Sequence, residues 1–406
     1  MARLATWGFE KEIEYLAIGN YDTTIVRSGS SSGKFVGNVV VTYNPAAWSA
    51  VASGADCFAR VYLYVPTGGL PSAQQEIFQL LNTVGAVELR LETNGTLTLW
   101  AFLGGTTWTQ EGSASAAITL DAWNKIELRE RNGVGSVDQC EGRLNDVSFA
   151  SATGLNISDA GAIQVAPGNL TGTGGAGASW YFDDLAVNDS SGASQTSWPP
   201  DSKIVLLLPI SDSAVGTGWT LGTGTAISAN GFDSVNNVPQ TGVADLAAGS
   251  DPKQIRNATS NANTNYDANL TTYFNAGVGP KSSINVLVPI VATAAPVSTS
   301  AKQGTVGIVS NPTIANIALG AGGTAGAFWS GSAGGTFSSG WKISFGTTTY
   351  APSVTITTSP VMRITQVTSS TRIAVVCFMG MYVDFTPGAL GKLASVNQSV
   401  GRSASY

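Results

Sequence analysis

The chain has 406 residues, only 11% of them charged, with a formal net charge of −6 and a sequence pI near 4.8. An acidic chain lacks the basic stripe that neutralises phosphates, which argues against a nucleic-acid-binding function. The sequence contains no histidine, which excludes Ser-His-Asp and Cys-His catalysis and His-ligated zinc.

The hydrophobic fraction of 43% is ample for folded cores, so the low charge does not indicate disorder. Short runs rich in β-branched and aromatic residues, separated by Gly, Asn and Pro, predict an all-β chain. In the first half, the predicted strands are 34–43, 58–65, 76–81, 87–92, 96–102, 125–131, a hairpin over 141–150 that turns at Asn145 and Asp146, and 179–189.

The clearest hairpin joins 87–92 to 96–102. Both runs alternate apolar and polar residues, so each is expected to turn one face to a core. Asn94 and Gly95 lie between them, and this pair predicts a two-residue turn.

The closing strand of the first half, Ser179–Asp189, reads SWYFDDLAVND. Asp183 and Asp184 interrupt its alternation, which predicts a bend or a bulge. With Asp189 nearby, these carboxylates are also a calcium candidate. Adjacent strand residues point to opposite faces, however, so a structural role in a turn or a hydrogen bond to the backbone is the favoured interpretation.

The second half begins after a connector, 191–203, that contains Trp198-Pro-Pro. The span 216–275 is polar and weakly periodic, so long loops are expected there, with one helical turn at most over 251–257. The predicted strands are 203–210, 283–293, 305–310, 314–319, 341–345, 354–357, 363–367 and 373–385. The fold class is therefore all-β, with two antiparallel sandwich domains at 1–190 and 204–386. The C-terminal arm, 387–406, is interpreted as a loose tail or as an arm that docks on a neighbour.

The first domain resembles the laminin-G/concanavalin A-like jelly rolls, because its parts follow in that family's order. The segments that carry this resemblance are FARVYLYV, EIFQLL, VELRLETNGTLTLW, LDAWNKIELRER, EGRLNDVSFA and SWYFDDLAVND. The junction SWPPDSKIVLLLPISD, followed by GWT and FDSVNNVP, is similar to a group of structural proteins of tailed-bacteriophage virions, usually described as minor tail proteins. This likeness covers about residues 5–290 and implies a second β-rich domain and a place in the virion.

Other features of the sequence bear on membrane insertion, export and disulfide formation. The longest apolar runs, 204–210 and 373–383, fall short of the roughly 18 residues of a membrane span. The first residues contain no apolar core of a signal peptide, which predicts synthesis in a host cytoplasm. Of the three cysteines, Cys57 and Cys377 are expected to be small buried hydrophobes, and no disulfide framework is expected with Cys140.

Glu88, Arg90 and Glu92 alternate along one strand, as paired carboxylates do in glycosidases of this fold. A cation between two carboxylates lowers their pKa, which is the wrong direction for a general acid. A solvent-facing charge ladder, with Glu127 and Arg129 opposite, is therefore the favoured interpretation.

Trp100 and Trp108 are candidates for a glycan or interface contact, since indole faces suit both sugars and protein partners. The glycine-rich loops lack the strand–GxxxxGK[ST]–helix context, so nucleotide binding is rejected. No catalytic residue, cofactor or metal is expected.

The sequence thus predicts a non-enzymatic structural protein of a tailed-phage virion that packs against itself and other virion proteins and is able to touch host glycans. The alternative is a carbohydrate-binding lectin or adhesin module, with a glycosidase as the weaker one.

Overall fold

The computed structural model describes residues 3–10, 21–42, 51–82, 86–104, 107–133, 137–157, 161–191, 195–221, 227, 231, 255–257, 264–271, 283–294, 302–308, 311–319, 321–322, 341–345, 360–366 and 373–387. Within these residues every regular element is a strand, and all pairings are antiparallel. The predicted all-β class is therefore confirmed. In the described part of the chain, no helix has the length and apolarity to cross a membrane.

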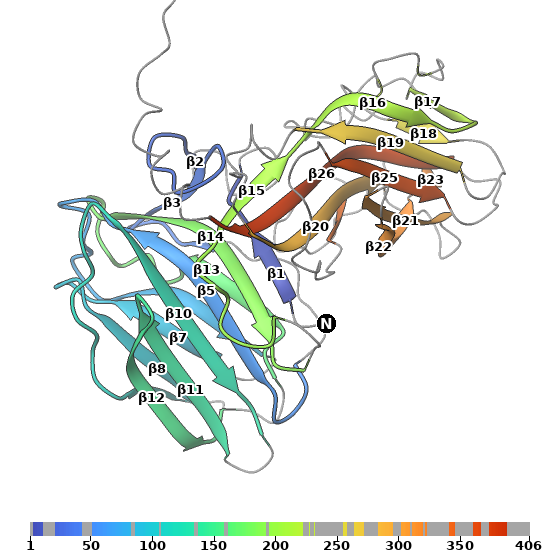
Figure 1. Cartoon of the computed structure of the whole chain (residues 1–406). Coiled ribbons are helices and arrows are strands. Elements are labelled where there is room, and N and C mark those ends of the chain that lie inside the picture. Colours follow the sequence, from blue (N-terminus) through green and yellow to red (C-terminus); the bar gives the residue numbers. More distant parts are fainter. Residues whose placement is uncertain are drawn as a thin grey trace, which may run out of the picture.

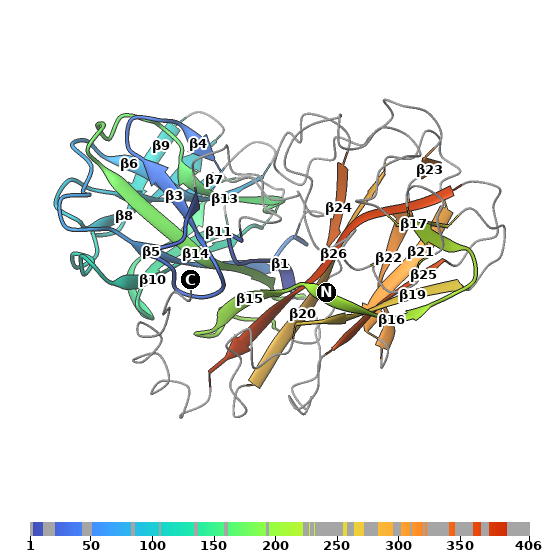
Figure 2. The ribbon, with the colours of Figure 1, turned by 90° about the horizontal axis from the view of Figure 1, so that it is seen from above.

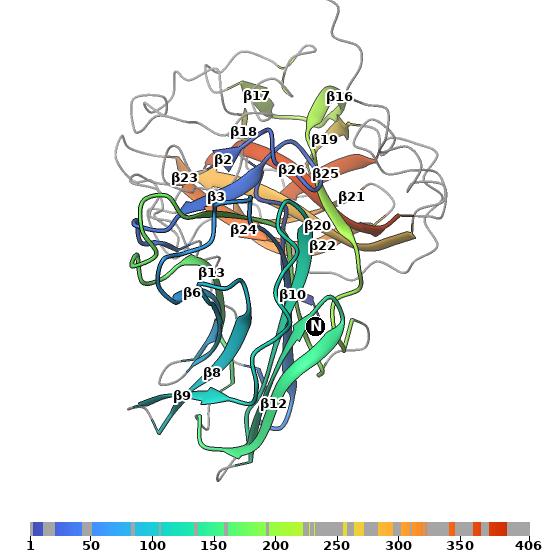
Figure 3. The same cartoon turned by 90° about the vertical axis from the view of Figure 1, so that its left-hand side faces the viewer.

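Strands β1–β14 form two facing sheets, seen as the blue-to-green lobe in Figure 1 and as two layers in Figure 3. An eight-stranded sheet has the order β12-β11-β10-β5-β14-β3-β2, with β1 also paired to β14. A six-stranded sheet has the order β4-β13-β6-β7-β8-β9. The bounds are β1 Arg3–Trp7, β2 Tyr21–Asp22, β3 Ser32–Val36, β4 Val41–Thr42, β5 Asp56–Tyr64, β6 Gln75–Leu81, β7 Ala86–Leu91, β8 Leu97–Leu103, β9 Thr107–Glu111, β10 Trp123–Arg131, β11 Asp138–Leu144, β12 Val147–Leu155, β13 Gln164–Asn169 and β14 Ser179–Asp189.

The core of this sandwich follows from the alternation of apolar residues. Val61 and Leu63 of β5 point inward from one sheet, and Leu89 of β7 and Leu99 of β8 point inward from the other. Trp180 is fully buried among them, and its indole donates to the carbonyl of Gly168 at 3.0 Å. A buried indole N–H usually finds a hydrogen-bond partner, and here Gly168 of β13 supplies it.

The hairpin between β7 and β8 is confirmed, but its turn is longer than the two residues predicted. The Gly95 amide donates to Glu92 at 3.0 Å and the Glu92 amide to Thr96 at 2.9 Å, so three residues form the loop. Gly95 has φ of 81°, the left-handed conformation that ends a type I turn with a bulge. The hairpin over 141–150 turns at Asn145 and Asp146 as predicted, both with positive φ.

The predicted strand over 34–43 is wrong as a single element. The chain leaves the eight-stranded sheet after Val36, turns through Gly37, and contributes β4 to the opposite sheet. The Gly37 amide donates to the carbonyl of Ala178 at 2.9 Å, and a Cβ at Gly37 would lie 2.7 Å from the Ala178 Cβ. The predicted strand 34–43 is therefore divided by the close approach of the backbone at Gly37 to Ala178, and not by a loss of apolar–polar alternation.

Strands β15–β26 form two further sheets, the yellow-green to red lobe of Figure 1. The seven-stranded sheet has the order β17-β18-β26-β20-β24, with β15 and β23 also paired to β26. The five-stranded sheet has the order β16-β19-β25-β21-β22. The bounds are β15 Lys203–Leu207, β16 Pro209–Val215, β17 Trp219–Leu221, β18 Ile255–Asn257, β19 Thr264–Leu270, β20 Ser283–Ala294, β21 Lys302–Ile308, β22 Asn311–Leu319, β23 Ala321–Gly322, β24 Trp341–Phe345, β25 Val361–Gln366 and β26 Ile373–Thr386.

Most strands predicted in the second half are confirmed within two or three residues. The single strand expected over 203–210 is instead two strands, β15 and β16, which belong to different sheets and meet at Leu208. The helical turn considered over 251–257 is wrong, because β18 occupies its described end, and β19 lies in a span expected to be loop. The predicted strand 354–357, and the arm 387–406 after Pro387, lie outside the described residues.

Candidate functional site

The described part of the connector, 195–203, forms a strap that packs on the first sandwich. Trp198 packs on Phe58 with ring centroids 5.1 Å apart, and the Arg143 guanidinium lies 4.1 Å from the Trp198 ring centroid. Phe58 and Arg143 point away from the core of the eight-stranded sheet, on its outer face. The segment that precedes the second half is thus held in place by contacts with the first sandwich.

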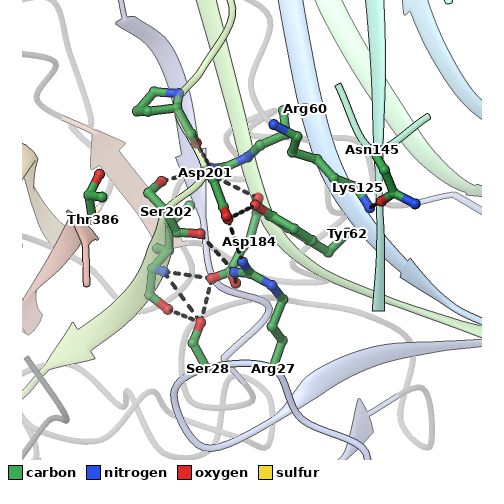
Figure 4. A network of polar contacts seen from close by, with 12 residues as sticks. Arg27, Ser28, Arg60, Tyr62, Lys125, Asn145, Asp184, Asp201, Ser202 and Thr386 are labelled. Atoms are coloured by element: carbon green, nitrogen blue, oxygen red, sulfur yellow. Dashed lines mark hydrogen bonds and ion pairs between the residues drawn. The ribbon is translucent and has the colours of Figure 1, made fainter. Parts of the chain in front are cut away.

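Asp184 organises the next turn of the chain (Figure 4). The register between β14 and β5 shifts between Asp183 and Ala186, so the predicted bulge is confirmed. Asp184 has φ of 54°, a left-handed conformation that Asp tolerates better than bulkier residues. Its carboxylate accepts hydrogen bonds from the Arg27 guanidinium, the Ser28 hydroxyl and, at 2.6 Å, the Ile204 amide. The bulge therefore anchors the first residues of β15.

Arg60 extends the same network from the middle of β5 (Figure 4). It is fully buried, and its guanidinium donates to the carbonyl of Pro200, to the Ser202 hydroxyl at 2.7 Å and to the carbonyl of Asp184 at 2.9 Å. The Tyr62 hydroxyl donates to the Asp201 carboxylate beside it. These bonds offset the cost of burying a guanidinium.

Arg3 and Asp384 form a second, fully buried link between the two lobes. The Arg3 Nη1 donates to the Asp384 Oδ2 at 2.5 Å, and the Arg3 Nε donates to Asn188 at 2.6 Å. Burial would raise the pKa of Asp384, but Arg3, Arg60 and further hydrogen-bond donors hold that pKa below its ordinary value. β1, β15 and β26 meet at this place, between the lobes in Figures 1 and 2.

We call the contacts of Arg3, Arg27, Arg60 and Asp184 with residues 198–204 and with β26 the interdomain joint. An apolar contact completes this joint. Ile204 and Tyr382 are fully buried and belong to the same apolar cluster as the first sandwich's core. A Cβ at Gly8 would lie 3.1 Å from the carbonyl oxygen of Ile204 and 3.2 Å from the Tyr382 ring. One continuous apolar core therefore runs from the first lobe into the second.

The calcium interpretation of Asp183, Asp184 and Asp189 gains no support. The Asp183 carboxylate accepts the amides of Arg27 and Ser28 at 2.9 and 3.2 Å, and Asp189 accepts from Ser191 at 2.6 Å. Burial and the neighbouring Asp184 raise the pKa of Asp183. Among the described residues no group of three Asp, Glu, Cys or His side chains could hold a metal ion. These hydrogen bonds instead fit the favoured interpretation, in which the carboxylates of Asp183 and Asp189 accept hydrogen bonds from nearby backbone and hydroxyl groups.

The second candidate site is the outer face of the six-stranded sheet, where Trp100 and Trp108 lie. Arg90 lies with its guanidinium carbon 4.0 Å from the Trp100 ring centroid and 5.3 Å from that of Trp108. Phe102 packs against Trp108 at 5.2 Å. Both indoles are half-buried. Because the Arg90 guanidinium lies near both rings, the structure brings the two predicted residues together around one cation.

Glu88 corrects the charge-ladder prediction. It shares the outer face with Arg90, as predicted, but it is fully buried instead of facing solvent. Gln79 donates to one Glu88 oxygen at 3.0 Å and Arg90 to the other at 2.6 Å. Burial outweighs Arg90 and raises the pKa of Glu88 to about 8, so the expected downward shift was wrong.

The prediction that Glu127 and Arg129 lie opposite this ladder is also wrong, because both belong to β10 in the other sheet. Burial raises the pKa of Glu127 to about 7 and that of Glu130 to about 8. Glu130 lies in the sheet between Cys57 and Cys140, both of them buried free cysteines. The side chain of Cys377 lies outside the described residues.

Sequence reasoning missed most of the joint. Nothing in the sequence links Arg27 or Arg3 to a carboxylate more than 150 residues away. One signal was present: Arg60 is a lone charge in the apolar run of β5, and such a residue needs a buried partner.

No model of a protein family matches the chain, and no curated protein matches it by sequence. Among solved structures it is similar to an endo-beta-1,4-glucuronan lyase from the fungus Trichoderma reesei, with 12% identity, a TM-score of 0.37, and coverage of 46% of this chain and 95% of the lyase. An alginate lyase from Chlorella virus shares 10% identity at a TM-score of 0.32, over 41% and 88% of the two chains. Domain 4 of an extracellular arabinanase from Geobacillus stearothermophilus, in complex with arabinotriose, shares 14% identity at a TM-score of 0.29, over 41% and 73%. Likeness at this level says nothing about function.

Proposed function

We propose that the chain is a non-catalytic structural component of a tailed-phage particle, located in the virion and held there by contacts with itself and with other virion proteins. The interdomain joint carries the proposal. The segment whose sequence is similar to the phage proteins, around Trp198–Ile204, is the segment that forms the strap and enters β15. The resemblance thus lies on residues that join the two sandwiches.

The joint suits a building unit. A fully buried ion pair, Arg3 with Asp384, and a partly buried one, Arg27 with Asp184, are combined with a continuous apolar core. Buried polar networks of this kind fix one geometry, because any other arrangement leaves a charge without a partner. A unit that must present the same surfaces in every copy of an assembly needs such a fixed geometry.

The chemistry of Glu88 supports a non-catalytic role. A pKa near 8 would suit a general acid. The carboxyl group, however, has no exposed surface, and both of its oxygens already accept hydrogen bonds from Gln79 and Arg90. A substrate oxygen would have to displace a neighbour before it could receive the proton.

Peptide mass spectrometry of gradient-purified, protease-shaved particles of the source phage tests the proposal, with an abundant host protein as the negative control. We expect peptides of this chain at a constant ratio to other virion proteins. Detection in the soluble lysate alone would contradict it.

A separate assay tests the non-catalytic role. Incubation of the chain with neutral and acidic polysaccharides should release no new reducing or unsaturated ends. Turnover that the variant Glu88→Gln loses would contradict the non-catalytic role.

A second function, contact with a glycan, is favoured by the Arg90–Trp100–Trp108 stack. Two half-buried indoles on one sheet face can stack on sugar rings, and the fold gives them a rigid base. Titration of the chain with neutral oligosaccharides, followed by tryptophan fluorescence, tests this. We expect saturable binding that Trp108→Ala weakens at least about tenfold, while Thr109→Ala, an exposed position on the same strand, leaves it unchanged. Equal binding by both variants would contradict it.

A further inference from the structure

Glu127 is a buried carboxyl group on the outer face of the first sandwich. It lies in register between Arg60 of β5 and Arg143 of β11, and residues paired across strands share a face of the sheet. Its side chain is only 1% exposed. Within the described part of the chain neither carboxyl oxygen has a hydrogen-bond partner, and the Lys125 Nζ lies 3.7 Å from its Oε1.

The strap crosses the sheet at Glu127. Trp198 lies 4.1 Å from the Arg143 guanidinium, and the carbonyl of Pro200 accepts a hydrogen bond from Arg60. These two contacts fall on either side of Glu127, and Pro199 between them is buried. Proline has no N–H to donate. The strap therefore removes the carboxyl group from water at a place where its backbone offers no hydrogen bond in return.

The charged and titratable groups around Glu127 come from the sheet and from the strap. They are Lys125 and Arg129 of β10, Arg60 and Tyr62 of β5, Arg143 and Glu141 of β11, Asp146 in the turn after β11, and Asp201 of the strap.

The cations of this set already have other acceptors. Lys125 contacts Asp146. Arg143 donates to Glu141 at 2.7 Å. Arg60 donates to the strap, at the carbonyl of Pro200 and the Ser202 hydroxyl. An ionised Glu127 beneath the closed strap is therefore only partly compensated.

We propose that Glu127 makes the strap a pH-dependent latch, which stays closed over the neutral carboxyl group and opens when that group ionises. Burial raises the pKa of Glu127 to about 7 under the closed strap. With the strap open, the carboxyl group is hydrated and faces cations, so its pKa returns to about 4.5 or lower. The equilibrium constant for opening should therefore rise about tenfold per pH unit between about pH 4.5 and pH 7, and level off above pH 7.

The latch is local. Burial would raise the pKa of Asp201, but the Tyr62 hydroxyl and Arg27 hold that pKa below its ordinary value, and burial raises the pKa of Tyr62. Neither shift brings the group into this pH window. The pair of Arg3 with Asp384 does not involve Glu127, so the lobes stay joined when the strap opens. This response does not depend on where the chain is located.

Hydrogen–deuterium exchange of the full chain at pH 5 and pH 7.5, followed by mass spectrometry of peptides that cover 195–203, tests the latch. Each wild-type rate is divided by that of Glu127→Gln at the same pH, which cancels the pH dependence of the exchange reaction itself. Gln imitates the neutral carboxyl group and keeps its volume. We expect this ratio to rise at least about tenfold from pH 5 to pH 7.5.

The matched control is Glu130→Gln, which removes a buried carboxyl group with a raised pKa from the opposite face of the same strand and should respond as the wild type does. A readout without any variant is the ratio of strap exchange to that of the exposed loop 112–117 in the wild-type chain, which should rise in the same way. Constant ratios at the two pH values would overturn the latch. Loss of protection in β1, β15 and β26 together with the strap would also overturn it, since the lobes would then separate as a whole.

Discussion

Arg3 and Asp384 are separated by 381 residues, yet the Arg3 Nη1 lies 2.5 Å from the Asp384 Oδ2, with both side chains buried. The pair joins the first described strand, β1, to the last one, β26. β1 pairs with β14 of the first sandwich, and β26 is the central strand of the seven-stranded sheet. The folding of each lobe is thereby coupled to that of the other.

Removal of one partner of this pair should be costly. We expect Arg3→Ala to lower the free energy of unfolding by about 3 to 5 kcal/mol, because it leaves the Asp384 carboxylate buried without its guanidinium. The combined variant Arg3→Met with Asp384→Leu removes both charges and should recover much of that loss. Urea unfolding followed by tryptophan fluorescence measures both. A double variant no more stable than the single one would contradict this interpretation.

Asp184 makes a separate prediction about the bulge. Asn accepts the left-handed conformation at φ of 54° and keeps an acceptor oxygen, whereas Ala does neither. Asp184→Ala should therefore cost about 3 kcal/mol or more, because Arg27 and the Ile204 amide lose their acceptor. Asp184→Asn should cost less. Limited proteolysis should cut the Ala variant at 195–202 faster than the wild type. Equal stability of the two variants would argue against the anchoring role.

The buried carboxylates predict that the free energy of unfolding declines as the pH rises from about 4.5 to about 8. The folded chain raises the pKa of Glu88 and Glu130 to about 8 and that of Glu127 to about 7, from about 4.5. A raised carboxyl pKa means that the folded state holds the proton more tightly than the unfolded state. The contribution is therefore complete below about pH 4.5 and is lost as the pH rises towards 8.

Urea unfolding at intervals between pH 5 and pH 9 measures this slope. Glu130→Gln imitates the protonated side chain, keeps its volume, and should flatten the decline. The lowered pKa of Asp384 acts in the opposite direction, with stability lost as the pH falls through that pKa, so it lies outside this window. A Gln variant with the slope of the wild type would contradict the assignment to Glu130.

Gly37 tests the crossing between the two sheets of the first sandwich. A Cβ there would lie 2.7 Å from both the Ala178 Cβ and the Gly175 carbonyl oxygen, and backbone cannot move aside as a flexible side chain can. We expect Gly37→Ala to destabilise the chain by about 1 to 3 kcal/mol. Gly177→Ala, where the added Cβ meets nothing within 4 Å, is the matched control for calorimetry. Equal melting temperatures for the two variants would contradict the close approach.

The sequence predicts strands well where alternation is strong and turns are marked. Asn145-Asp146 and the Asp183-Asp184 interruption were both interpretable from local rules. Alternation alone does not say which sheet a strand joins, and this is why 34–43 and 203–210 were each predicted as one strand. The partners of Arg27 and Arg60 depend on contacts across more than 100 residues, which no local pattern encodes.

The burial of Glu88 illustrates a different gap. The neighbouring Arg90 is visible in the sequence. The loss of hydration that raises the pKa of Glu88, however, depends on how Gln79 and the surrounding sheet pack against the Glu88 carboxyl group. Local charge was therefore a poor guide to the sign of the shift.

The central claim is that this chain is a fixed, repeated unit of a virion. Cryo-electron microscopy of the source phage particle tests it most directly. We predict density, repeated by the particle's symmetry, into which both sandwiches fit as one body, with Arg3 and Asp384 in contact. A complete particle map whose every density is filled by other proteins would contradict the claim.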